Sequence, residues 1–198
     1  QYNWLLNQLD SSDARWKIIG QQVMIAPLRI SGIPVNLDQW DGYPQERLRL
    51  LNDIISHDIN DVMVLTGDIH SSWANDVPLN ANTYNNIFPN GNNSVMGEFV
   101  TTSITSPALP IGAGSLLVMS SNPYVKYVEL SKHGYLLLDI NKTRTQGEFY
   151  HMTTTTTPNS QDAFADAWYQ NHNERFLTHA TGPSSIPTNL YPQAPLLP

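Results

Sequence analysis

The stretch Val62–Val77, V-M-V-L-T-G-D-I-H-S-S-W-A-N-D-V, is the most informative part of this sequence. Val62–Thr66 are apolar or β-branched residues and predict a buried strand that stops at Gly67. Asp68 and His70 follow at once, and residues i and i+2 of an extended backbone lie on the same side. We therefore expect a carboxylate and an imidazole to leave the carboxyl end of a strand together, where the ligands of open α/β sheets collect. A hard oxygen donor beside a nitrogen donor makes this pair a candidate metal site.

Other interpretations of the pair stay open at this point. A D-x-H triplet arises freely by chance, and an Asp that caps a helix beside a structural His is the plain alternative. A second metal interpretation is the facial triad of iron oxygenases, but that motif runs His-x-carboxylate, the reverse of the order here. The surroundings favour a cation, because the sequence has no Lys or Arg between Arg49 and Lys126.

The composition limits the classes of function. The 198 residues are enough for one domain with its own core. A net charge of −7 argues against nucleic acid as the main partner, so we expect no nucleic-acid scaffold role. The lack of Cys excludes disulfides and Cys-ligated zinc within the sequence, and no apolar run reaches the roughly 20 residues that span a bilayer. The sequence opens at Gln1 without an initiator Met or a leader, and we expect a processed or cleaved product.

Hydrophobic spacing predicts alternating helices and strands. The first part is predicted to contain a helix over Tyr2–Leu9, a strand over 16–26, a helix over 45–56 that Pro44 opens, and the strand at 62–66. The second part is predicted to contain a strand over 98–104, three successive antiparallel strands over 126–130, 135–140 and 145–152, and a short helix over 163–169. A strand, helix, strand unit predicts a sheet with helices packed on it.

Other chemical motifs are weaker. The five remaining histidines are poorer candidates. His57 lies at the end of a predicted helix, His133 in a turn, and His172 and His179 in the polar C-terminal region. His151 ends a strand and could face a cleft, but we favour a structural role for it. The sequence has no G-x-S-x-G elbow, which argues against a serine hydrolase. It also has no P-loop and no G-x-G-x-x-G pattern, the two common nucleotide-binding motifs.

Five blocks in order give a more specific signal than any single motif. They are W-K-I-I-G-Q-Q-V-M-I-A (16–26), W-D-G-Y-P-Q-E-R-L-R-L-L (40–51), V-L-T-G-D-I-H-S-S-W-A-N-D (64–76), G-E-F-V-T-T-S-I-T-S (97–106) and N-P-Y-V-K-Y-V-E-L-S-K-H-G-Y-L-L-L-D-I (122–140). Together they resemble the C-terminal half of the PhoD-type alkaline phosphatase and phosphodiesterase family, within the calcineurin-like metallophosphoesterases. One departure is Tyr124, where relatives often carry His after Asn-Pro.

The resemblance implies a fold and a division of the chain. It implies an α/β fold, a four-layer α/β/β/α sandwich of which this chain is the C-terminal part. Residues 1–157 would be the C-terminal half of the metallophosphoesterase domain, and residues 158–198 a C-terminal helix and an extended Pro-rich tail that pack on it.

The resemblance also implies an activity and a site. The family's G-D-x-H motif falls on Gly67, Asp68 and His70, which implies that Asp68 and His70 are catalytic metal ligands, Asp68 for calcium and His70 for iron, with other divalent metals as alternatives. The substrate would be a phosphate ester, and the remaining ligands would come from the N-terminal half of the same protein, as a covalent or a nicked chain. Such enzymes are extracytoplasmic (secreted or periplasmic) and bacterial. A phospholipase D-like or nucleotide phosphodiesterase, and a binding module that has lost catalysis, stay open as alternatives.

Overall fold

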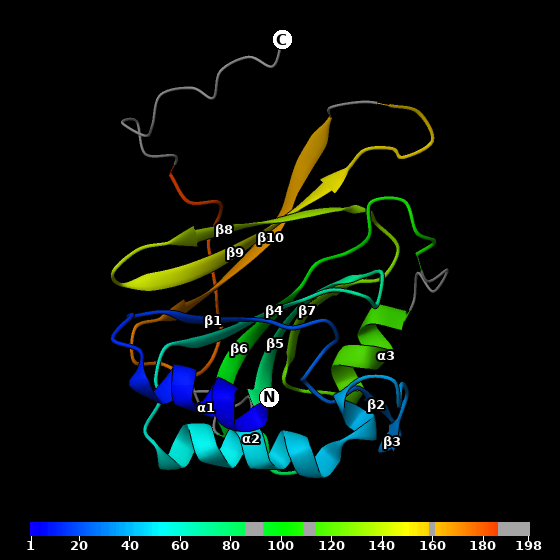
Figure 1. The fold of residues 1–198 in the computed structure, drawn as a ribbon. Coiled ribbons are helices and arrows are strands. Elements are labelled where there is room, and N and C mark those ends of the chain that lie inside the picture. The colour runs from blue at the N-terminus through cyan, green and yellow to red at the C-terminus, as the bar shows by residue number, and fades with distance from the viewer. Residues whose placement is uncertain (86–92, 109–113, 159–160, 186–198) are drawn as a thin grey trace.

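The computed structural model describes residues 1–85, 93–108, 114–158 and 161–185, which form three layers (Figure 1). Helices make the first layer, a five-stranded sheet the second and a four-stranded sheet the third. The α/β class is confirmed, and the described residues supply three layers of the expected α/β/β/α sandwich. The helices are α1 (Tyr2–Ser11), α2 (Pro44–Ser56), α3 (Gly114–Ser121) and the 3-10 helix η1 (Trp40–Gly42).

The five-stranded sheet brings three strand ends to one edge. Its order is β1-β4-β6-β5-β7, with β1 (Lys17–Gly20), β4 (Val62–Thr66), β6 (Ser94–Val100), β5 (Ser72–Pro78) and β7 (Val125–Glu129). Strands β1, β4 and β6 run parallel, whereas β5 is antiparallel to both of its neighbours. The last residues of β1, β4 and β6 therefore meet at one edge, which we call the carboxyl edge; the opposite edge is the amino edge.

The four-stranded sheet is wholly antiparallel and covers one face of the first sheet. Its order is β11-β10-β9-β8, with β8 (Gly134–Ile140), β9 (Arg144–Met152), β10 (Asp162–Asn171) and β11 (Thr178–His179). A separate hairpin joins β2 (Arg29–Ile30) to β3 (Ile33–Pro34).

Burial on both faces explains the sequence of β4. Val62 and Val64 pack in the core beneath the helices, and Met63 packs in the core between the two sheets. A central parallel strand covered on both sides reads as a continuous apolar run rather than an alternating one. Helix α2 covers this strand layer with Leu50, Leu51 and Ile54, and Pro44 begins it at the first turn, where a missing N–H costs nothing. Within the described residues, no helix has the length and apolar character needed to cross a bilayer.

The two sheets approach closely at one glycine. The core between them contains Met63, Ala74, Phe99, Phe149 and Leu177. Phe99 and Phe149 meet edge to face with ring centroids 6.1 Å apart. A Cβ atom on Gly147 of β9 would lie 2.7 Å from Cζ of Phe99, so this position leaves no room for a side chain. The absence of a side chain at Gly147 therefore allows the second sheet to pack closely against Phe99 of the first.

Several predicted strands are shifted or paired differently. The strand predicted over 16–26 ends at Gly20, and the one predicted over 98–104 is β6, which begins at Ser94 and ends at Val100. The strand at 126–130 does not precede 135–140 in one antiparallel sheet: β7 pairs with β5 in the first sheet, and the chain then crosses to the second sheet. Strand β5 was not predicted, because its central Asn75 and Asp76 are polar although fully buried.

The predicted C-terminal helix is wrong. Residues 163–169 belong to β10, a ten-residue strand that pairs with β9 along its length. Alternate Ala residues favour a helix locally, but cross-strand pairing and burial outweigh such weak preferences. The chain then crosses the second sheet, where the Ser184 N–H donates to Oε1 of Glu148 at 2.6 Å. Most of the predicted tail, 186–198, lies outside the described residues.

Candidate metal site at the carboxyl edge

Two segments form the carboxyl edge around the candidate site. Gly67–Ser71 joins β4 to β5, and Thr101–Ala108 follows β6. The Thr101 N–H donates to the carbonyl of Thr66 at 2.9 Å, which continues the strand pairing by one step and holds the two segments together. We call Thr101–Ala108 the edge segment.

The backbone of Gly67–Ser71 is a tight turn with two left-handed residues. Asp68 has φ 73° and His70 has φ 56°. The Ile69 N–H donates to the carbonyl of Gly67 at 2.9 Å and closes the turn. Strand β4 ends at Thr66, before the pair. The prediction that an extended backbone places Asp68 and His70 on the same side is therefore wrong, because the backbone between them turns. A left-handed conformation costs a non-glycine residue about 1 kcal/mol or more, and such strain concentrates at functional sites.

His70 is held in the tautomer that suits a metal ligand. Its Nδ1 lies 3.1 Å from the backbone carbonyl of Pro107 in the edge segment. Because a carbonyl only accepts hydrogen bonds, the neutral ring carries its hydrogen on Nδ1 and keeps the lone pair on Nε2. Metal-binding histidines typically donate their other ring N–H to a carbonyl or a carboxylate in this way.

Asp68, unlike His70, has no described hydrogen-bond partner. Its side chain is exposed, and the described residues offer it no hydrogen bond or ion pair. An uncompensated carboxylate beside a histidine with a bare Nε2 fits a cation in both charge and donor type.

The described residues supply only part of a coordination shell. No group of three or more His, Cys, Asp or Glu residues lies close enough to hold a metal ion in the parts of the chain that the structure describes. A structural zinc takes four ligands and calcium six to eight. A metal site that used Asp68 and His70 would therefore need further ligands.

A second histidine at this edge was predicted to be only structural. Nδ1 of His133 lies 3.2 Å from the carbonyl of Ser103 and 3.1 Å from its Oγ. The Ser103 hydroxyl donates to the carbonyl of Ser106 at 2.8 Å, so its oxygen accepts from His133. Nδ1 of His133 therefore carries the hydrogen, and Nε2 is left with its lone pair. The edge segment thus fixes His70 and His133 in the same way, an arrangement that no sequence motif revealed.

His151 lies at the same edge, on the inner face of the second sheet. Its Nε2 is 3.3 Å from Oγ of Ser72, the first residue of β5. Burial lowers the pKa of His151, and nearby Lys132 acts in the same direction against Glu129. The ring is therefore held neutral, and we assign it a structural role.

Glu98 of β6 points into the core and is not available to a cation at this edge. Glu98 is fully buried and accepts hydrogen bonds from the Ile25 N–H at 2.6 Å, the Ala26 N–H at 3.1 Å and Nδ2 of Asn75 at 3.0 Å. Burial raises its pKa. These bonds hold the segment after β1 against the sheet. Glu98 therefore serves the core and not the candidate site.

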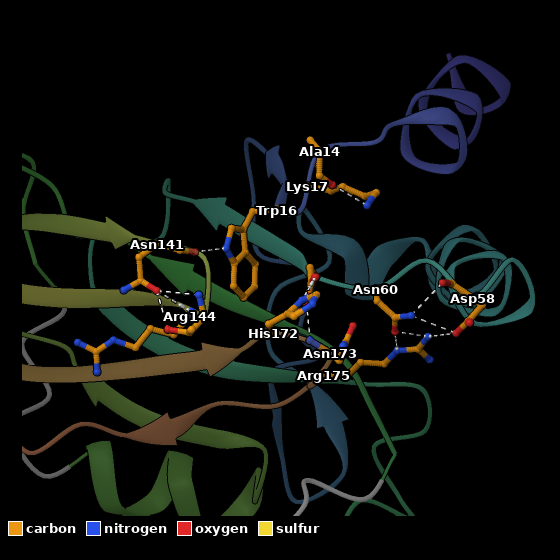
Figure 2. Close-up of polar contacts among 12 residues, drawn as sticks. Ala14, Trp16, Lys17, Asp58, Asn60, Asn141, Arg144, His172, Asn173 and Arg175 are labelled. Atoms are coloured by element: carbon orange, nitrogen blue, oxygen red, sulfur yellow. Dashed lines mark hydrogen bonds and ion pairs between the residues drawn. The ribbon is translucent and has the colours of Figure 1, made fainter.

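The amino edge carries another Asp and His pair with a different role (Figure 2). Asp61 precedes β4, and its carboxylate is paired with Nδ1 of His172 at 2.5 Å and with the Asn173 N–H at 2.7 Å. Close by, Arg175 donates to Oδ1 of Asn60 at 2.9 Å. This group joins the loop after β10 to the residues that precede β4 in the first sheet.

Comparisons with known proteins agree on one family. The sequence profile of the PhoD-like phosphatases matches residues 1–149. Alkaline phosphatase D of Bacillus subtilis (strain 168) is 33% identical over 164 residues, which are 80% of this chain and 27% of that protein. A solved structure titled "Structure of PhoD" matches with a TM-score of 0.76 and 27% identity, over 92% of this chain and 34% of that one. The chain thus spans about a third of the length of these relatives. Since the family profile covers more than half of its residues, this chain belongs to the PhoD-like phosphatase family.

Proposed function

We propose that this chain supplies Asp68 and His70 to the metal site of a phosphate-ester hydrolase of the alkaline phosphatase type. One observation carries the proposal: a strained turn at the carboxyl edge presents an unpaired carboxylate beside an imidazole whose Nδ1–H is already donated to Pro107. Such a pair is arranged to receive a cation instead of a partner within the chain. Membership of the PhoD-like phosphatase family supports the reaction class.

The chain's own residues have distinct tasks in this proposal. Asp68 would hold calcium and Nε2 of His70 would hold iron, with other divalent metals as alternatives. Bound cations supply Lewis-acid polarisation of the phosphoryl oxygens. The Nδ1–H of His70 is committed to the carbonyl of Pro107, which fixes the ring and leaves Nε2 available to a metal. The edge segment supports this ring from one side through the carbonyl of Pro107.

The proposal includes a partner and a location. The remaining ligands would come from the N-terminal half of the same protein, joined covalently or as a nicked chain, because the described residues contain no group of three or more His, Cys, Asp or Glu placed to hold a metal ion. The coverage of the relatives, 27% and 34% of their lengths, supports a larger whole. We propose an extracytoplasmic place of action, secreted or periplasmic, in a bacterium.

The test measures phosphate release by two preparations: the 198-residue chain alone, and the chain together with the N-terminal half, both loaded with calcium and iron. We expect hydrolysis only by the two-part preparation. Full activity of the chain alone would refute the divided site. Comparison of a phosphomonoester with a phosphodiester separates a phosphatase from the phospholipase D-like and nucleotide phosphodiesterase alternatives. No hydrolysis of either ester by the loaded two-part protein would overturn the proposal in favour of a binding module.

A further inference from the structure

A pocket of about 400 Å³ lies next to the candidate site. Its lining includes Ile104 and Thr105 of the edge segment together with Tyr135, Met152 and Pro158. The same segment holds His70 through Pro107 and His133 through Ser103. The backbone that fixes the two histidines therefore also shapes this pocket.

The lining of the pocket is uncharged. None of the described residues that line it is acidic or basic; its polar groups are the hydroxyls of Tyr135 and of threonines from the edge segment and the segment after β9. An ionic group would lose hydration there without gaining a charged partner. The exposed atoms of the lining are mostly apolar despite these hydroxyls, and pockets of this size and character typically bind small organic molecules.

The aromatic wall is held in place before any ligand arrives. The Tyr135 ring stacks on Tyr150 with centroids 5.2 Å apart and planes 9° from parallel. Phe164 meets Tyr150 edge-on at 5.7 Å, and the Tyr135 hydroxyl donates to Asp162. A wall that is already ordered loses little conformational entropy on binding, which favours recognition of a flat apolar group.

We propose that this pocket binds the uncharged organic group of the phosphate ester, an aromatic or aliphatic alcohol moiety, while the phosphoryl group binds at Asp68 and His70. The inference rests on the proposed function and adds the substrate class to it. Esters of apolar alcohols are preferred over esters whose organic part carries further charges, such as nucleoside diphosphates.

Binding is tested first, with 1-naphthol and the 198-residue chain in a calorimetric titration. Ile104 is 77% exposed at the wall of the pocket, so a substitution there leaves the core intact. Ile104→Asp and Ile104→Lys are each expected to weaken naphthol binding about tenfold, because both place a charge where an apolar group binds. Leu116→Asp is the matched control, an 80% exposed leucine of α3 outside the pocket, and should bind like the unchanged chain. Absence of naphthol binding, or equal affinity in all variants, would overturn the proposal.

Kinetics of the two-part protein separate this inference from the proposed function. Ile104→Asp should raise KM for 1-naphthyl phosphate about tenfold and leave KM for methyl phosphate unchanged. If hydrolysis proceeds but Ile104→Asp affects both esters alike, the pocket proposal fails and the proposed function stands. If no ester is hydrolysed but naphthol binding depends on Ile104, the proposed function fails and the pocket stands as a site for apolar organic groups.

Discussion

The two ends of β4 carry the same pair of residue types in opposite states. Asp61 just before the strand and Asp68 just after it both have left-handed backbones, with φ 59° and 73°. Asp61 is 4% exposed, and His172 and a backbone N–H satisfy its two oxygens, whereas Asp68 is exposed with no described partner. Nδ1 of His172 is hydrogen-bonded to a carboxylate, whereas Nδ1 of His70 is hydrogen-bonded to a carbonyl and its Nε2 remains available to a ligand. The pair before β4 is therefore compensated within the chain, whereas the pair proposed to bind metal leaves its carboxylate without a described partner.

The largest expected effect is on catalysis at the carboxyl edge. In the two-part protein, Asp68→Asn or His70→Gln should lower kcat/KM for a phosphate ester about 1,000-fold, or about 4 kcal/mol of transition-state stabilisation, because each removes a metal ligand. Thermal unfolding should shift little, since Asp68 has no described partner to lose. Asp10→Asn and His57→Gln, at exposed positions on α1 and at the end of α2, are matched controls and should keep full activity. Wild-type rates in the Asp68 or His70 variants would show that the pair after β4 has no more part in catalysis than the pair before it.

A third aspartate, Asp76 on β5, is fully buried and tests how burial affects the pKa of a carboxyl group. It accepts hydrogen bonds from Tyr84 at 2.5 Å and from the Leu177 N–H at 2.7 Å, and it pairs with Lys126 at 3.4 Å. Burial raises its pKa from 3.8 to about 6 against these three partners. An acid whose pKa is raised in the folded state binds a proton on folding, so its contribution to stability is greatest below pH 4 and is lost as the pH rises to about 6.

Asp76→Asn removes this dependence. Chemical denaturation of both proteins between pH 4 and pH 7 should show the wild type losing up to about 3 kcal/mol relative to the variant across this window. Stability curves that run parallel over the whole range would show that the partners fully offset the burial of Asp76.

The pair at the amino edge should matter for stability instead of rate. Asp61→Ala leaves the Asn173 N–H and Nδ1 of His172 without their acceptor in a part-buried site. We expect the free energy of unfolding to fall by about 2–3 kcal/mol, measured by urea denaturation. Phosphate release per folded molecule should stay at the wild-type value. A large loss of activity at unchanged stability would mean that this end of the strand takes part in the reaction.

The smallest effect is expected at the rim of the amino edge. Asp58 pairs with Arg175 at 3.3 Å, but its side chain is 88% exposed. Asp58→Asn should change the free energy of unfolding by no more than about 0.5 kcal/mol, because water and salt screen such pairs. A loss comparable to that of Asp61→Ala would show that the whole amino-edge network acts as one unit.

Local patterns were sufficient for part of the fold. The bounds of β4 and α2 agree with their apolar spacing, and β8 and β9 begin within one residue of the prediction. Strand β5 was missed because buried polar residues such as Asn75 become acceptable only through partners far away in sequence, here Glu98. Strand β10 was mistaken for a helix because its pairing with β9, not its alanines, decides its conformation.

The candidate site was predictable in position but not in geometry. The strand followed by G-D-x-H places Asp68 and His70 at the carboxyl edge, and their metal-binding role stays a prediction. The carbonyls that fix His70 and His133 belong to the edge segment, about 35 residues away along the sequence from His70. Such contacts leave no local signature in either segment.

The central claim is that the pair after β4 binds metal and the pair before it does not. Anomalous scattering from crystals of the metal-loaded two-part protein tests this most directly. We predict a peak within bonding distance of Asp68 and of Nε2 of His70, lost in the His70→Gln variant and retained in Asp61→Asn. No peak at Asp68 and His70, or a peak that depends on Asp61 and His172, would contradict the account.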